Sequence, residues 1–149
     1  MSDNWLLYVP HDPWFQPNAG AIARAEALLR HMFPQADEIS SQSSALPQFV
    51  HAGGNWDGVW CSSCGADLGS TWSSLVDSQD KGEGFPSLLV NAPCCGASVS
   101  LNDLRYGWPV AFGRFVLDAM NPNVASLSER IDQLEQVLGC QVREIQRHL

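Results

Sequence analysis

The sequence C-S-S-C-G at residues 61–65 and the sequence P-C-C-G at residues 93–96 decide how the middle of this chain folds. Cysteine thiolates bind Zn²⁺ strongly, and a C-x-x-C turn directs two sulfurs toward one metal ion. The glycine after each pair lets backbone N–H groups approach the sulfurs, because glycine has no Cβ atom. We therefore predict a structural Zn²⁺ site with four ligands: Cys61, Cys64, Cys94 and Cys95.

The second cysteine pair departs from the pattern of a regular zinc ribbon. A second C-x-x-C would require a cysteine at position 92, where the chain has Ala92. Successive side chains point in different directions, so Cys94 and Cys95 reach the same ion only if the backbone is locally distorted. Three ligand sets remain open. They are the four cysteines, a set in which His51 replaces Cys94, and a set in which water fills the fourth position.

A water ligand defines the alternative function, a small zinc-dependent hydrolase with an open metal position. An open position on zinc can activate water, and the reaction then needs a general base. Asp57 and Asp67 flank the first cysteine pair and are the candidates, although both also suit hydrogen bonds to backbone N–H groups in turns. The H-E-x-x-H and nucleobase-deaminase patterns are absent, and so are phosphate-binding and dinucleotide-binding motifs.

Length and composition predict one globular domain over residues 1–149, with a metal-binding insert over residues 53–96. No apolar run approaches the ~20 residues of a membrane span, and the first residues show no secretory signal. We therefore expect a cytoplasmic protein. In that reducing compartment paired cysteines are metal ligands more often than disulfides. The fifth cysteine, Cys140, lies apart from the others, and we expect it to be a buried structural thiol.

The charge of the chain indicates what kind of partner it binds. Sixteen acidic and eight basic side chains give a net charge of -8. Nucleic-acid binding requires clustered basic residues, so this balance disfavours it. An acidic surface speeds the capture of a basic protein. Trp56, Trp60 and Trp72 lie near the cysteines, either as an apolar shell around the metal or as an exposed acidic and aromatic patch for a protein partner.

Hydrophobic patterning predicts an α+β fold, in which helices pack on one face of a mostly antiparallel sheet that carries a zinc-ribbon-like insert. A split β-α-β arrangement is the candidate topology. Strands are expected at residues 5–9, 36–39, 47–51, 85–90, 97–101 and 140–149. Helices are expected at residues 18–33, 69–76 and 110–120, and from the capping-box pair Ser126 and Glu129 to Gly139.

The second half of the chain resembles small, uncharacterised bacterial proteins that contain a zinc ribbon. The strings that carry this resemblance are P-C-C-G, S-L-N-D-L at residues 100–104, Y-G-W-P at residues 106–109, G-R-F at residues 113–115 and M-N-P-N at residues 120–123. The resemblance implies no activity. Small acidic bacterial proteins of this kind look like immunity proteins that neutralise toxins. Because the chain is acidic and carries no catalytic set of residues, the leading prediction is a non-enzymatic, cytoplasmic protein-binding protein with a structural zinc site.

Overall fold

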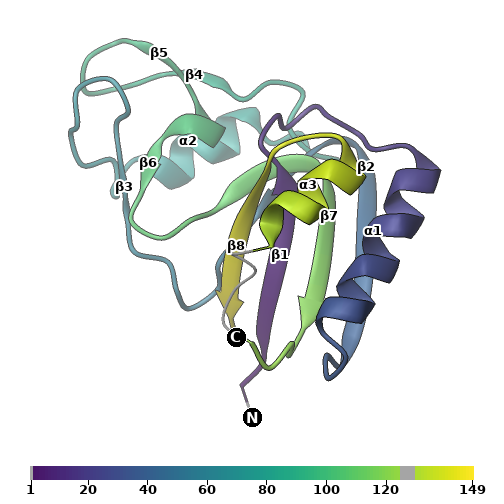
Figure 1. The fold of residues 1–149 in the computed structure, drawn as a ribbon. Coiled ribbons are helices and arrows are strands. Elements are labelled where there is room, and N and C mark those ends of the chain that lie inside the picture. Colours follow the sequence, from purple (N-terminus) through teal and green to yellow (C-terminus); the bar gives the residue numbers. More distant parts are fainter. Residues whose placement is uncertain (1, 125–129) are drawn as a thin grey trace.

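A four-stranded antiparallel sheet forms the centre of the fold in the computed structural model, which describes residues 2–124 and 130–149 (Figure 1). Two helices, α1 (Ala19–Met32) and α3 (Ile131–Leu138), cover one face of this sheet. The prediction of an α+β fold with a mostly antiparallel sheet is confirmed. The order of the strands across the sheet is β2 (Glu38–Val50), β7 (Ala111–Met120), β1 (Asn4–Pro10) and β8 (Val142–His148).

The order of the strands produces two split β-α-β units. Strands β1 and β2 are both antiparallel to β7, which lies between them, so β1 and β2 are parallel to each other. The helix α1 (Ala19–Met32) joins them. Strands β7 and β8 are likewise parallel on either side of β1, and α3 (Ile131–Leu138) lies between them in the sequence. This β-α-β-β-α-β order is that of a ferredoxin-like sandwich.

The main core lies between the sheet and the two helices. Alternate residues of β1 and β7 point toward the helices, because successive side chains of a strand face opposite sides. These residues include Tyr8 and Phe115, which are fully buried against Leu29 of α1 and Leu134 of α3. Local signals fix the helix ends. The Asn18 side chain accepts a hydrogen bond from the Ala21 N–H, and Gly139 ends α3 with a φ of 81°.

The cysteines lie in the long connection between β2 and β7, which we call the cysteine lobe (residues 59–106). Figure 1 shows this lobe beside one end of the four-stranded sheet. The lobe has a hydrophobic core of its own, which Phe112 of β7 joins. That the chain is one domain with an insert over residues 53–96 stays a prediction. The elements of the lobe are β3 (Val59–Trp60), α2 (Trp72–Gln79), β4 (Leu89–Asn91), β5 (Ser98–Ser100), the 3-10 helix η1 (Leu101–Asp103) and β6 (Arg105–Tyr106).

The prediction of a helix over residues 110–120 is wrong, because this segment forms the central strand β7. It pairs with β2 on one side and β1 on the other, and its residues are buried on both faces in its first half. A strand buried on both faces is apolar throughout, so its sequence shows no clear alternation and is easily taken for a buried helix.

The prediction of two separate strands at residues 36–39 and 47–51 is also wrong, since one strand, Glu38–Val50, runs from the end of the first segment through most of the second. The serine-rich stretch between them was expected to be a loop. It forms an edge strand whose hydroxyls bond to other elements. Ser40 donates to Asp118 of β7, and Ser41 donates to Glu26 of α1. The pairing of β2 with β7 shifts its register between Ser43 and Gln48, next to the point where the second of the two strands was predicted to begin.

The remaining elements match the prediction more closely. Strands lie at residues 5–9, 97–101 and 140–149 as predicted, and β8 is an edge strand of the sheet. The strand predicted at residues 85–90 is shorter and begins later, because β4 starts at Leu89. The helix α2 begins three residues later than expected, at Trp72. The capping-box pair Ser126 and Glu129 lies outside the described residues. In the described parts of the chain, no helix has the length and apolar character that a membrane span requires.

Candidate metal centre

The first cysteine pair lies in a tight loop that follows β3. The Gly65 N–H donates to the Cys61 carbonyl over 3.0 Å, and the Cys61 N–H donates to the Ala66 carbonyl over 2.8 Å. Gly65 has a φ of 78°, a conformation that side chains with a Cβ rarely adopt. This backbone loop holds the sulfurs of Cys61 and Cys64 on the same side.

The second loop, between β4 and β5, repeats this backbone geometry with one change in the cysteines. The Gly96 N–H donates to the Ala92 carbonyl over 2.7 Å, and the Ala92 N–H donates to the Ala97 carbonyl over 2.8 Å. By these bonds Ala92 occupies the position of Cys61 in the first loop, and Cys95 that of Cys64. Cys94 therefore occupies the position of Ser63. The irregularity expected from the sequence is a displaced cysteine within a regular loop.

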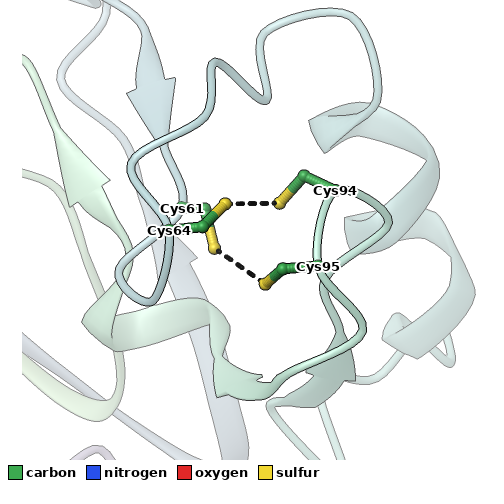
Figure 2. Close-up of side chains that lie close together, drawn as sticks. All are labelled: Cys61, Cys64, Cys94 and Cys95. Atoms are coloured by element: carbon green, nitrogen blue, oxygen red, sulfur yellow. Dashed lines mark hydrogen bonds between the residues drawn. The ribbon is translucent and has the colours of Figure 1, made fainter.

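The two loops face each other and bring the four sulfurs together (Figure 2). Cys61 Sγ lies 3.9 Å from Cys95 Sγ, and Cys64 Sγ lies 3.2 Å from Cys94 Sγ. All four sulfurs lie within 4.8 Å of one another. A tetrahedron with metal–sulfur bonds of about 2.3 Å has sulfurs about 3.8 Å apart. The four cysteines are thus placed to bind a metal such as zinc.

Hydrogen bonds within the cluster shift the pKa values of two thiols in opposite directions. The pKa of Cys61 is lowered to about 6, chiefly by the backbone N–H groups of Cys64 and Ser63. The Ser63 N–H lies 3.4 Å from the Cys61 sulfur. The pKa of Cys94 is raised to about 12, first by its hydrogen bond with Cys64. These N–H groups thus favour the thiolate form of Cys61, which is the form that binds a metal.

The other candidate ligands and bases lie outside the cluster. The His51 ring is exposed, and its Nδ1 accepts the Gly53 N–H over 3.1 Å. The Asp67 carboxylate accepts the Gly69 N–H over 2.7 Å, which is the turn role. Across the described residues, the four cysteines form the only close group of three or more side chains that could hold a metal. With all four sulfurs bound, zinc would join the two loops and leave no coordination position for water.

The fifth cysteine and the tryptophans have roles distinct from the metal cluster. Cys140 is partly buried against the main core, and burial raises the pKa of its thiol to about 11.

The Trp56 ring is 40% exposed, with its centroid 4.8 Å from that of Trp72 and 5.8 Å from that of Tyr106. The Trp72 indole N–H also donates to the Tyr106 hydroxyl. Trp56 is thus a partly exposed ring that packs against two other aromatic rings.

Sequence reasoning missed Asn102, which fastens the cysteine lobe to the sheet. Its side chain is buried, and its Nδ2 donates to the His11 carbonyl over 3.3 Å. Its Oδ1 accepts the Phe112 N–H over 2.9 Å and an Arg143 N–H over 3.3 Å. No local pattern reveals this role, because the partners belong to three different parts of the chain.

Sequence reasoning also missed a group of charged residues in a cavity beside the sheet, formed by Arg114, Asp118 and Arg147. The signal available was the single aspartate in the otherwise apolar run F-V-L-D-A-M at residues 115–120.

Comparison of the chain with protein-family models, with curated proteins and with solved structures finds no match. The functional conclusion therefore rests on geometry and surface chemistry.

Proposed function

We propose that the chain is a non-enzymatic protein-binding protein in which Zn²⁺, held by Cys61, Cys64, Cys94 and Cys95, is a structural cross-link. The observation that carries this proposal is the convergence of four sulfurs from two facing loops. Four thiolates fill a tetrahedral zinc ion, as in structural zinc sites. The small paired strands β3, β4, β5 and β6 are only two or three residues long, so a bound metal would contribute much of the stability of the lobe.

The surface of the chain supports a protein partner with a basic face. The net charge of -8 would attract such a partner over long range. Trp56 offers an exposed ring, and the exposed Asp57 follows it directly. Tryptophans held in place by their neighbours contribute strongly to protein interfaces, because little side-chain freedom is lost on binding. We propose Trp56 as the centre of the binding surface.

The finer proposal is that the partner is a toxin, which the chain neutralises in the cytoplasm. Its support is the acidic charge of this small chain, which would draw it to a basic toxin. The alternative, a zinc hydrolase, has no specific observation in its favour. Its candidate ligand His51 and one candidate base, Asp67, are engaged in local hydrogen bonds, and the other candidate base, Asp57, is exposed and lies outside the cysteine cluster.

Co-purification from the native cells tests the proposal, followed by reconstitution with the purified partner. A basic protein should be retained by the wild-type chain, and Trp56→Ala should weaken the reconstituted complex by about tenfold or more. Trp14→Ala is the matched control, because Trp14 is also exposed, at 42%, but lies in the loop after β1. The proposal is wrong if the chain is always recovered alone and the zinc-loaded protein hydrolyses a substrate.

A further inference from the structure

A small cavity lies on the face of the sheet that the two helices leave open. Leu6 and Tyr8 of β1 face the helices, so Leu7 between them faces the other side. Beyond its register shift, β2 continues into residues that pack on this face, since Val50 and Ala52 share a buried cluster with Leu7. The space that remains has a volume of about 120 Å³.

Gly113 of β7 lies at a close contact with β1. A Cβ atom on Gly113 would lie 2.6 Å from Cγ1 of Val9, which is closer than atoms can approach. A glycine at such a point permits a bend and a close approach of backbone to side chain. Gly113 lines the cavity, which lies between β7 and the end of β2.

Two arginine side chains line this cavity, and both are positioned by backbone carbonyls. The Nε of Arg114 donates to the Ser44 carbonyl over 3.1 Å, and its Nη1 donates to the Trp14 carbonyl over 3.3 Å. The Nε of Arg147 donates to the His51 carbonyl over 2.8 Å. Neither guanidinium forms an ion pair with a carboxylate among the described residues, although the chain has twice as many acidic as basic residues.

A carboxylate lines the same cavity. Asp118 is partly buried, and the Ser40 hydroxyl lies 3.0 and 2.9 Å from its two oxygens. Burial raises the pKa of Asp118, while the charge of Arg147 lowers it. Asp118 and Arg147 come from β7 and β8, with β1 between them, and Leu7 of β1 also lines the cavity. Residues of both charge signs therefore line one small space, together with the apolar residues Leu7 and Val116.

We propose that this cavity binds a small zwitterion, an α-amino acid with a short side chain. The ligand carboxylate pairs with the guanidinium groups of Arg114 and Arg147, and the ligand ammonium group pairs with Asp118. Guanidinium groups suit carboxylates because their N–H groups form a planar fork. The side chain of the ligand lies against Leu7 and Val116. A volume of about 120 Å³ has room for several water molecules, which limits the ligand to a small molecule.

Titration of the full-length, zinc-loaded protein by calorimetry and NMR tests this site. The probes are glycine, L-alanine and L-serine, with acetate and methylammonium as the two halves of the ligand. We expect at least one of these amino acids to bind at millimolar concentration or below, and each half alone to bind about tenfold more weakly or worse. The amide signals of β7 and β8 should shift on binding.

Two variants and one control locate the binding. Arg147→Gln and Asp118→Asn should each weaken amino-acid binding by about tenfold or more, because each removes one charge-assisted interaction. Arg24→Gln, on the exposed surface of α1, should leave binding unchanged. Circular dichroism confirms that each variant is folded.

Three results would overturn the proposal. The first is that none of the three amino acids binds the wild-type protein. The second is that acetate binds as tightly as the amino acids, which would make the cavity an anion site. The third is that the folded Arg147→Gln and Asp118→Asn variants bind as tightly as the wild type.

Discussion

Two substitutions would give the second loop the same cysteine spacing as the first loop. Cys94→Ser gives the second loop a serine where the first loop has Ser63. Adding Ala92→Cys then places a thiol where the first loop has Cys61. Ala92 is 1% exposed and Cys61 is fully buried, and both make the same pair of backbone hydrogen bonds. The double variant therefore has two matching C-x-x-C loops.

The expected effects follow from the number of thiolates that reach the metal. Zinc-binding free energies of small zinc modules are about 10–16 kcal/mol at pH 7, or on the order of 3 kcal/mol for each of four ligands. Cys94→Ser alone should therefore weaken zinc binding by roughly a hundredfold or more. The double variant regains the fourth thiolate at a position that the backbone already presents. Its affinity should return to within about tenfold of the wild type.

Competition with a chromophoric chelator measures these affinities, with Cys140→Ser as the control, because Cys140 lies against the main core. The control should bind zinc as the wild type does. If Cys94→Ser binds zinc as tightly as the wild type, Cys94 is not a ligand. If the double variant binds no more tightly than Cys94→Ser, the two loops are not equivalent.

Three further predictions concern the parts of the fold that surround the two sites. Asn102→Ala leaves the buried Phe112 N–H without its acceptor, and should lower the free energy of unfolding in urea by about 2–3 kcal/mol; a loss below about 0.5 kcal/mol would show that this anchor is unimportant. The raised pKa of Asp118 means that its protonated form favours the folded state. This stabilisation is lost as the pH rises above about 4, the ordinary pKa of an aspartate. The stability of Asp118→Asn relative to the wild type should therefore be higher at about pH 7 than at about pH 3 in paired urea titrations, and an equal difference at both values would contradict the raised pKa. Gly113→Ala should lower stability by about 1–3 kcal/mol through its clash with Val9, and Val9→Ala should recover part of that loss in thermal melts.

Elements with local signals could be predicted from the sequence. Asn18 and Gly139 mark the ends of α1 and α3 because a helix cap depends on residues within one turn. The cysteine loops belong to the same class, since C-x-x-C-G and the mismatch at Ala92 can be read from a few residues. The choice between Cys94 and His51 could not be made in this way. It depends on how two loops some thirty residues apart face each other.

The wrong predictions concern segments whose structure depends on pairing with strands that are distant in the sequence. Strand β7 pairs with β1 and β2, more than sixty residues away, and that pairing on both sides makes a strand of an apolar run that could equally form a helix. The serine-rich part of β2 is held by β7 in the same way. The cavity residues Arg114, Asp118 and Arg147 were missed because their proximity follows from this pairing.

X-ray absorption at the zinc edge of the zinc-loaded protein tests the closed four-thiolate centre most directly. We predict a coordination sphere of four sulfurs at about 2.3 Å. A nitrogen or oxygen ligand at about 2.0–2.1 Å in place of one sulfur would contradict the closed centre, and would return the search for function to the metal.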